Sequence, residues 1–398
     1  MADLLTIEEA QRLILERIGP PRAEPVALQD AEGRILAETA RSLVDLPPFP
    51  SSAMDGFALR SADTPGRLPI VFRIAAGSPA PGPLAEGEAM GIATGGVVPD
   101  GADAVIPIEY VVEHDNEVEV SEPVAPAVNV RARGSDAHVG DVVLEAGARL
   151  GPAQLGALAA AGVSEVVCGA RPRATVLTTG TELRAPGETL GPGEVYEANG
   201  LILEAQLRSA GAVTERLAAV ADDEAAHRAA LERGLEADVL VSSGGVSVGP
   251  HDLVRRIEAE LGVEEVFWRV AVKPGKPVSF GLRGSTLVFG LPGNPVSSLV
   301  GFELFVRPAV LALQGFADPL PRFEPGELTA AVERSPARDQ LVRARARPGN
   351  DGAVRLEPVV GQESHMIVRA AAADALVLVP RGEGELQAGA IARYLRLG

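Results

Sequence analysis

The chain has 398 residues, of which 46% are hydrophobic, so it can fill more than one hydrophobic core and we expect about two to four domains. Its formal net charge of −18 at pH 7 repels nucleic acid backbones, so a polyanionic partner is not expected outside a local basic pocket. A single cysteine, Cys168, excludes an internal disulfide and a cysteine-rich metal site, and none of the five histidines has the His-Glu-x-x-His spacing of a zinc hydrolase.

The N-terminal region predicts a helix followed by an inserted β domain. No basic stretch with an apolar run precedes Thr6, so we expect no secretory signal and a cytoplasmic protein. Thr6 and Glu9 form a capping box for a helix that stops before Gly19. Short apolar runs between glycines and prolines predict a β domain at 46–139, and a helical pattern returns at Leu150–Gly162. The expected N-terminal helical domain is therefore discontinuous, with residues 1–45 and 140–171.

Residues 172–317 alternate short apolar strands with amphipathic helices, which is typical of a doubly wound, mostly parallel α/β sheet. In such sheets ligands bind beyond the carboxyl ends of the strands. The last helix contains Glu303, Arg307 and Pro308, so it is not expected to span a membrane. The expected strands are Ala174–Thr179, Val213–Val220, Val239–Ser243, Val266–Val272 and Thr286–Gly290, and the expected helices are Asn199–Ala210, Asp223–Leu235, Leu253–Leu261 and Val296–Gln314.

Residues 322–398 predict a C-terminal β domain. The segment Leu341–Arg347 alternates with period two, which places Arg343, Arg345 and Arg347 on one strand face.

Polar loops follow the expected strands of the α/β domain. Residues 242–249 contain three glycines and three serines between a strand and a helix. Glycines let backbone N–H groups approach phosphate oxygens, and the following helix terminus favours negative charge. The alternative is a glycine-rich turn that only links two elements. In the loop Leu291–Ser298, Asn294 and Pro295 fit the N-cap and first position of a helix, with Gly293 before them.

Three carboxylates, Glu182, Asp222 and Asp252, come from different strand ends. Mg²⁺ is usually held by one or two carboxylates together with substrate phosphates. Each acid also has a plainer interpretation, since Asp222 and Asp252 can cap helices and Glu182 can be a solvated loop charge. Taken together with nearby lysines, the three acids favour a metal–phosphate site.

The two lysines of the chain, Lys273 and Lys276, lie three residues apart in one turn, and the other 34 of the 36 basic residues are arginine. A lysine ammonium is a compact charge on a flexible stem, suited to phosphate or another oxyanion. The turn therefore predicts an anion site, with chance placement in a solvated loop as the alternative.

Residues Gly245–Gly249 also match the Gly-x-Ser-x-Gly elbow of serine hydrolases, with Ser247 as nucleophile. A triad would need a later histidine, and His365, which is the only one after His251, lies in the C-terminal domain. Pro250 also delays the helix past the place where an elbow needs it. A serine hydrolase is nevertheless an alternative function.

Six different motifs are spread along nearly the whole chain, at Pro48–Ala58, Ile92–Val105, Asn129–Asp136, Ser242–Gly249, Val272–Pro277 and Leu291–Pro295. In this order they resemble the molybdopterin molybdenumtransferase family, known as MoeA and, in animals, as the gephyrin E domain. The resemblance implies a homodimer of four-part subunits with an adenylyltransferase-like α/β domain and a C-terminal β-barrel, so the expected fold class is α/β plus β. The implied reaction inserts molybdate into adenylylated molybdopterin and releases AMP, assisted by a divalent cation such as Mg²⁺. Molybdopterin adenylyltransferase and other proteins of the cofactor pathway are the implied partners.

The resemblance also implies roles for individual residues. Glu182, Asp222 and Asp252 would hold Mg²⁺ or position the pyrophosphate, while Lys273, Lys276 and Arg269 would bind molybdate or phosphate. The inserted β domain of the other subunit would contribute Asp55, Thr94, Arg131 and Asp136 to the cleft. The remaining implied substrate-binding positions are Thr179, Gly180, Ser243, Gly244, Gly245, Ser247, Pro292, Gly293, Asn294, Arg343 and Ser364.

Some positions depart from the family pattern or have plainer interpretations. Asp55 reads equally well as a turn residue and Arg131 as a surface charge. Arg269 stands where some members carry a third lysine, and Ser135 replaces an acidic residue of some relatives, so both bear on anion affinity. A gephyrin-like scaffold is the other alternative function, but the sequence offers no linker or additional domain that favours it.

Overall fold

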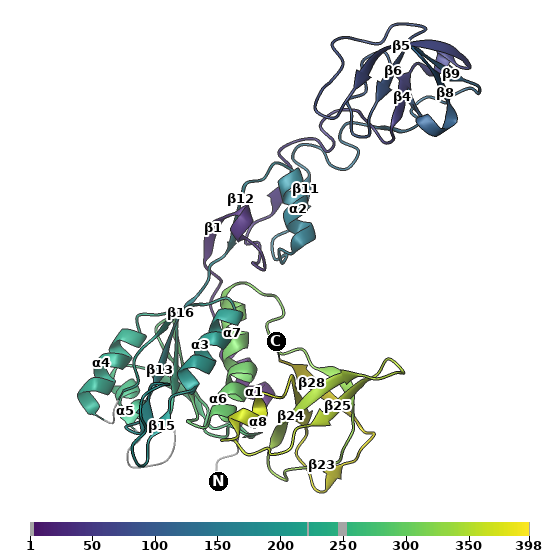
Figure 1. Cartoon of the computed structure of the whole chain (residues 1–398). Coiled ribbons are helices and arrows are strands. Elements are labelled where there is room, and N and C mark those ends of the chain that lie inside the picture. Colours follow the sequence, from purple (N-terminus) through teal and green to yellow (C-terminus); the bar gives the residue numbers. More distant parts are fainter. Residues whose placement is uncertain (1–3, 221–222, 246–252, 398) are drawn as a thin grey trace. The chain divides into compact units, whose positions relative to one another are not determined.

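The computed structural model describes residues 4–220, 223–245 and 253–397, and the chain divides into two compact units (Figure 1). The larger unit comprises Met1–Glu24 and Gly169–Gly398, and the smaller unit comprises Pro25–Cys168.

A six-stranded sheet forms the centre of the larger unit. Strands β16, β13, β17 and β21 are parallel neighbours, and β20 and β18 extend the sheet with antiparallel pairing. The central strands are buried along nearly their whole length, as expected for strands covered on both faces. The bounds are β13 (Arg173–Thr178), β16 (Val213–Arg216), β17 (Val239–Ser243), β18 (Glu264–Trp268), β20 (Ser279–Arg283) and β21 (Thr286–Leu291), with the short pair β14 (Leu183–Arg184) and β15 (Val195–Tyr196) after β13.

Helices cover both faces of this sheet. Val239 and Val241 point into a core shared with α1, α3, α6 and α7, whereas Leu240 between them points into a second core with α4 and α5. The predicted doubly wound architecture is therefore confirmed, and so is the capping box of Thr6 and Glu9 at the start of α1. The bounds are α1 (Ile7–Leu15), α3 (Asn199–Ser209), α4 (Glu224–Gly234), α5 (Leu253–Glu260), α6 (Pro295–Gly301) and α7 (Arg307–Leu313).

Helices α6 and α7 join through a π-helical segment, η4 (Phe302–Val306), into one helix over Pro295–Leu313. By length and composition this helix could cross a membrane, but 72% of its most apolar window is buried inside the protein. Glu303 and Arg307 pair at 2.6 Å, and Glu303 also accepts a hydrogen bond from Gln206 of α3. The segment is therefore a core helix, as its charged residues predict.

The C-terminal region closes into the predicted β-barrel, because β24, β25, β22, β28 and β26 pair in that order and β26 returns to β24. Strand β19 (Val272–Lys273) adds beside β24, and Leu341, Leu376 and Leu378 pack into the core of the α/β sheet. The bounds are β22 (Glu324–Leu328), β23 (Val332–Glu333), β24 (Asp339–Pro348), β25 (Val354–Pro358), α8 (Ile367–Ala370), β26 (Ala375–Val379), β27 (Glu385–Leu386) and β28 (Ile391–Arg396).

The smaller unit contains the predicted inserted β region, whose strands pair in the order β7-β4-β6-β5-β9-β8. Its other segments share a core that includes Val26, Leu36, Leu158 and Cys168. The bounds are β1 (Ala23–Ala27), η1 (Leu28–Asp30), β2 (Ala40–Arg41), β3 (Ser51–Ser52), β4 (Gly56–Leu59), η2 (Ser61–Asp63), β5 (Gly66–Ile74), β6 (Ala89–Ile92), β7 (Ala104–Pro107), η3 (Ile108–Tyr110), β8 (Val112–His114), β9 (Glu117–Val120), β10 (Val130–Arg131), β11 (Val142–Leu144), α2 (Pro152–Ala160) and β12 (Glu165–Gly169).

The structure differs from the sequence-based expectation in four places. The expected strand Val213–Val220 ends at Arg216. Helix α1 packs in the larger unit through Ile7 and Ile14, so it does not share a core with the segments around Leu150–Gly162. The expected strand Val266–Val272 ends at Trp268, because Arg269 adopts a φ of +80° and turns the chain. Strand β20 was not predicted, since Gly281 interrupts its apolar run; a Cβ there would lie 2.9 Å from the Glu264 carbonyl oxygen, so the close pairing with β18 requires glycine.

Candidate ligand site at the strand ends

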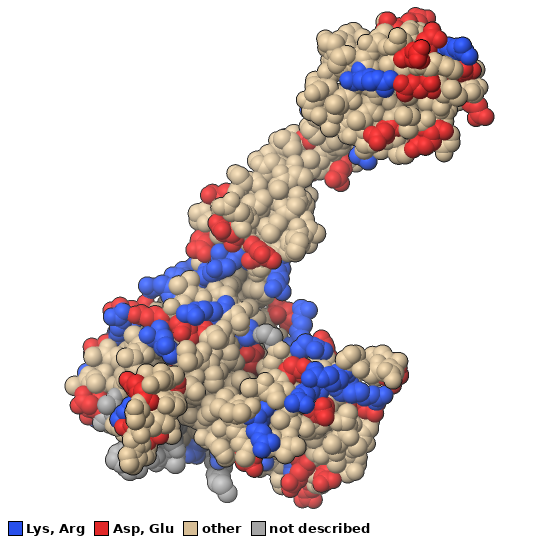
Figure 2. All heavy atoms as spheres, in the orientation of Figure 1, with Lys and Arg blue, Asp and Glu red and all other residues tan. Residues whose placement is uncertain are grey.

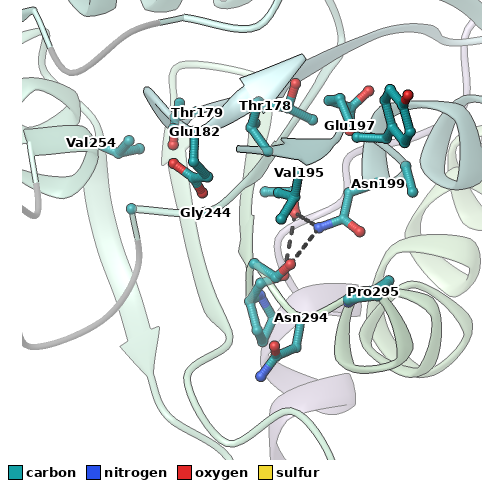
Figure 3. Close-up of a pocket in the computed structure, with 18 of the residues that line it drawn as sticks. Thr178, Thr179, Glu182, Val195, Glu197, Asn199, Gly244, Val254, Asn294 and Pro295 are labelled. Carbon is teal, nitrogen blue, oxygen red and sulfur yellow. Dashed lines mark hydrogen bonds between the residues drawn. The ribbon is translucent and has the colours of Figure 1, made fainter. Parts of the chain in front are cut away.

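A cavity of about 830 Å³ lies at the carboxyl ends of β13, β17 and β21 (Figure 3). This is the place where open α/β sheets bind ligands, and the volume suits a ligand of drug-like size. Loops after all three strands contribute to its walls, together with β15, α3, α5 and α6. The predicted site residues that line it are Thr179, Gly180, Glu182, Ser243, Gly244, Gly245, Pro292, Gly293 and Asn294.

Glycine is required where β17 leads into the cavity wall. Gly244 has a φ of +95°, and a Cβ there would lie 2.8 Å from the Thr179 carbonyl oxygen. Gly245 has a φ of +65°, and its Cβ would lie 2.5 Å from Val254 Cγ2. The N–H of Gly244 already donates to the Leu291 carbonyl at 3.1 Å. The loop therefore brings backbone without side chains to the cavity wall. The N–H of Gly244, however, already donates a hydrogen bond within the protein.

Asn199, the first residue of α3, connects the end of β17 to the loop after β21, as the dashed lines in Figure 3 show. Its Nδ2 donates to Ser243 Oγ at 2.9 Å and to the Gly293 carbonyl at 2.7 Å. Ser298 Oγ donates to the Pro292 carbonyl at 2.6 Å and lies 3.1 Å from Ser243 Oγ. This network fixes the end of β17 against the loop after β21. Sequence reasoning missed Asn199, because an asparagine at a helix start looks like a local cap.

Of the three predicted carboxylates, Glu182 lies on the cavity wall, and its Oε2 would be 2.5 Å from a Cβ built on Gly180. Asp222 and Asp252, like Ser247, lie outside the described residues. The cap of α4 is Asp223, whose carboxylate accepts a hydrogen bond from the Ala226 N–H at 2.8 Å. The interpretation of Asp222 as the cap of this helix is therefore wrong.

Among the described residues that line the cavity, the carboxylates are those of Glu182 and Glu197. Within 4–220, 223–245 and 253–397, no group of three or more His, Cys, Asp or Glu side chains could hold a metal ion. Glu197 also lines the cavity, but its carboxylate accepts from the Gly200 N–H at 2.7 Å and faces Arg216 at 3.6 Å. Of the three predicted ligands, Glu182 is therefore the one that the described residues place on the cavity wall. Mg²⁺ commonly takes carboxylates together with substrate oxygens and water.

The two-lysine turn lies beside the cavity. A Cβ on Gly275 would be 3.5 Å from the Ser297 carbonyl of α6, and Pro277 lines the cavity wall. Lys273 and Lys276 are exposed, and neither side chain has an ion pair or hydrogen bond with a described residue. Their side chains are not among the lining residues. Elsewhere basic and acidic side chains lie side by side (Figure 2), as in the pair Arg347–Asp374 at 2.9 Å. The lysines therefore differ from these arginines in leaving their charge available.

Arg269 is not among the residues that line the cavity, and its guanidinium stacks on an aromatic ring. Its Cζ lies 3.6 Å from the ring centroid of Trp268, and Arg255 Cζ lies over the same ring at 4.1 Å. A planar guanidinium stacks on an aromatic ring better than an ammonium does, which gives arginine a structural reason at this position.

The C-terminal barrel also reaches the cavity. Arg343 is 2% exposed, and its guanidinium donates a hydrogen bond to the Gly361 carbonyl. The Ser364 carbonyl accepts a hydrogen bond from the Val296 N–H at 3.1 Å. His365 and Ile367 line the cavity. A further lining residue that the sequence did not reveal is the buried His227 of α4, whose Nδ1 lies 3.0 Å from the Asp223 carbonyl.

Four predicted residues lie in the smaller unit. Asp55 Oδ1 accepts from the Thr94 N–H at 2.7 Å and from the Thr94 hydroxyl at 3.0 Å, and these bonds, the backbone one first, lower the pKa of Asp55. Arg131 lies on β10, which pairs with β3 just before Asp55. The Asp136 N–H donates to the Leu46 carbonyl at 2.8 Å. The structure therefore joins Asp55 to Thr94 directly.

Chemically, the strand-end cavity combines close backbone, an amide and hydroxyl network, and a carboxylate. The adjoining turn adds two ammonium groups that have no partner within the part of the chain that the structure describes. This set suits a large polar anion held by hydrogen bonds and charge. Ser247, the nucleophile of the hydrolase alternative, lies outside the described residues, and the described cavity serine, Ser243, bonds to the Pro292 carbonyl and lies near Ser298 Oγ.

Three protein-family models match successive parts of the chain. Residues 5–162 match the MoeA N-terminal region (domain I and II), residues 175–312 match a probable molybdopterin binding domain, and residues 325–397 match the MoeA C-terminal region (domain IV).

Individual proteins are similar over nearly their full length. The chain is 35% identical to molybdopterin molybdenumtransferase 2 of Mycobacterium tuberculosis, covering 96% of this chain and 97% of the relative. It is 34% identical to the molybdopterin molybdenumtransferase of Haemophilus influenzae, covering 97% of each. Among solved structures, a molybdopterin biosynthesis MoeA protein from Pyrococcus horikosii superposes with a TM-score of 0.83 at 30% identity, covering 99% of both chains.

Proposed function

The chain belongs to the molybdopterin molybdenumtransferase family, and on this premise we propose that it inserts molybdate into adenylylated molybdopterin and releases AMP. The enzyme is a transferase of molybdenum cofactor biosynthesis. The observation that carries the assignment is the similarity to molybdopterin molybdenumtransferases along almost the whole chain, which includes the domain that holds the strand-end cavity. The serine hydrolase and scaffold alternatives have no comparable support.

In the proposed reaction the cavity binds the nucleotide-linked pterin. The glycine loops let the ligand approach the backbone. The hydrogen bonds of Asn199 hold the end of β17 and the loop after β21 in fixed positions around the ligand. Lys273 and Lys276 attract molybdate and the phosphates to the adjoining turn, because their ammonium groups have no internal partners among the described residues. These positive charges also stabilise the negative charge that develops on the departing AMP.

We further propose Mg²⁺ as the metal cofactor, held by Glu182 together with Asp222 and Asp252. A bound divalent cation would neutralise charge on the phosphates of the substrate. Glu182 supports the proposal by its place on the cavity wall.

The proposed working form is a cytoplasmic homodimer. In it the smaller unit of one subunit would contribute Asp55, Thr94, Arg131 and Asp136 to the site of the other subunit. Molybdopterin adenylyltransferase is the proposed source of the substrate, since the reaction consumes an adenylylated pterin.

The test is direct: purified protein is incubated with adenylylated molybdopterin, Mg²⁺ and molybdate, and AMP is quantified. AMP release that depends on molybdate is expected. The variants Lys273→Ala and Asp252→Ala should lose cofactor formation while the circular dichroism spectrum stays unchanged, and Arg283→Ala on β20 serves as a control for loss of an exposed cation. Full activity of Lys273→Ala would contradict the role given to the turn.

A further inference from the structure

A buried arginine of the barrel holds the loop 361–366 in one conformation. Arg343 Nη2 donates to the Gly361 carbonyl at 2.8 Å and to the Glu363 carbonyl at 3.3 Å, and Nη1 donates to the Met366 carbonyl at 3.2 Å. The side chain is 2% exposed, and its position on β24 fixes it to the closed barrel. Because the guanidinium is occupied by protein carbonyls, Arg343 is suited to shape the loop and not to bind an anion itself.

Gln362 completes this clamp. Its Oε1 accepts from Arg343 Nε at 3.2 Å and from the Arg343 N–H at 3.0 Å, while its Nε2 donates to the Arg343 carbonyl at 2.9 Å and to the Val359 carbonyl at 2.7 Å. The amide therefore has partners on both sides. A loop with this many internal bonds presents its outer side chains from a fixed backbone.

The clamped loop contacts the α/β domain beside Asn294. The Ser364 carbonyl accepts from the Val296 N–H at the start of α6. Asn294 occupies the N-cap position of this helix, yet its side chain makes no capping hydrogen bond and lines the cavity instead. The helix start is thus bonded from the barrel, and the Asn294 amide is available to a ligand.

His365 is the next residue of the loop, and it lines the cavity together with Asn294 and Pro295. Its side chain is exposed and has no hydrogen-bond partner among the described residues. An imidazole fixed by its backbone and free at its ring nitrogens can donate to an oxygen of a bound ligand. A cavity of about 830 Å³ is also much larger than a tetrahedral oxyanion needs.

We propose that His365 is a substrate-contacting residue, which donates a hydrogen bond to the adenylylated pterin, and that Arg343 is a positioning residue which acts through the loop. The inference rests on the proposed function and assigns the C-terminal barrel a part in binding the pterin nucleotide. Molybdate is assigned to the lysine turn, so the two substrates should respond differently to changes in the loop.

The first test is steady-state kinetics of His365→Ala, with His114→Ala on β8 of the smaller unit as the matched control. Loss of a hydrogen bond to a charged ligand should raise the KM for adenylylated molybdopterin about tenfold, with kcat within about twofold and the KM for molybdate unchanged. His365→Gln, which keeps a donor, should recover part of the loss. If the wild-type protein releases AMP and His365→Ala has the same kcat and KM values as wild type, the inference is wrong while the proposed function stands. If the wild-type protein releases no AMP, the proposed function itself fails.

A double-mutant cycle tests the role of Arg343. Arg343→Lys keeps a charge but cannot reach the same set of carbonyls, so the KM for adenylylated molybdopterin should rise. In the His365→Ala background, Arg343→Lys should raise this KM by less than about a third of its effect in wild type, because the imidazole through which Arg343 acts is already absent. Additive effects would overturn the positioning role. If Arg343→Lys does not fold, Gln362→Ala loosens the same loop and takes its place in the cycle.

Discussion

The guanidinium carbon of Arg269 lies 3.6 Å from the ring centroid of Trp268, the single tryptophan of the chain. Arg269 holds this position from a backbone with a φ of +80°, which is uncommon for any residue other than glycine. Its N–H donates to the Val278 carbonyl at 2.8 Å, so the turn after β18 is fixed from both the backbone and the side chain. The backbone hydrogen bond therefore links the end of β18 to the segment just after the lysines, and the stack fixes the Arg269 side chain on the neighbouring ring.

Replacing Arg269 by alanine should uncover the tryptophan. Without the guanidinium over the ring, collisional quenching of Trp268 fluorescence by acrylamide should increase, and the unfolding free energy should fall by about 0.5–1 kcal/mol. Arg269→Lys should give an intermediate result, because an ammonium stacks less well. Arg283→Ala, on the neighbouring β20, is the control that should leave quenching unchanged. Equal quenching of wild type and Arg269→Ala would show that the stack does not persist in solution.

Gly244→Ala should remove activity and destabilise the α/β domain by about 1–3 kcal/mol. The added Cβ would meet the Thr179 carbonyl oxygen at 2.8 Å in a backbone with a φ of +95°. Gly262→Ala separates the two causes, since its φ of +85° is similar and nothing lies within 4 Å of its Cβ. Chemical denaturation should show a larger loss for Gly244→Ala. Equal losses would mean that backbone strain alone matters and that the contact with Thr179 does not.

Local sequence signals account for much of the fold and for part of the site. Thr6 and Glu9 predict their capping box because both partners lie within one turn, and Ser243, Gly244 and Asn294 could be placed at the strand ends because parallel strands share one edge. Asn199 was missed, and His365 was considered only as a triad residue of a separate domain, because the surroundings of both depend on long-range packing. Asn199 meets Ser243 across 44 residues and Gly293 across 94. The burial of Arg343 likewise follows from closure of the barrel, which the alternating pattern of its strand does not reveal.

Asn199→Ala should uncouple the end of β17 from the loop after β21. The change removes both Nδ2 hydrogen bonds, so the unfolding free energy should fall by about 1–2 kcal/mol. Because Gly293 and Ser243 then lose their common donor, kcat/KM for AMP release should fall by about ten- to a hundredfold. Asn350→Ala, at an exposed turn of the barrel, is the control for asparagine removal. Stability loss without a change in kcat/KM would assign Asn199 to the fold alone.

The bond between Asp55 and Thr94 predicts a pH-dependent stability of the smaller unit. Hydrogen bonds from the Thr94 N–H and then its hydroxyl lower the pKa of Asp55 in the folded state. A lowered carboxyl pKa stabilises the fold fully above the pKa of the unfolded chain, which is about 3.9 for aspartate. That stabilisation is lost as the pH falls through the lower folded value. Asp55→Asn cannot titrate, so its Tm should lie below that of wild type near pH 7, and the difference should shrink below about pH 4.

Calorimetric scans between pH 7 and pH 3 measure this difference, with Asp115→Asn in the turn between β8 and β9 as the control. Asp115 is exposed, so its replacement should leave the Tm difference close to zero throughout. Thr94→Ala removes the hydroxyl donor but keeps the backbone N–H, which is the larger cause of the lowered pKa. It should therefore reproduce only part of the effect of Asp55→Asn. A Tm difference for Asp55→Asn that stays constant from pH 7 to pH 3 would mean that ionisation of Asp55 does not contribute to the stability of this unit.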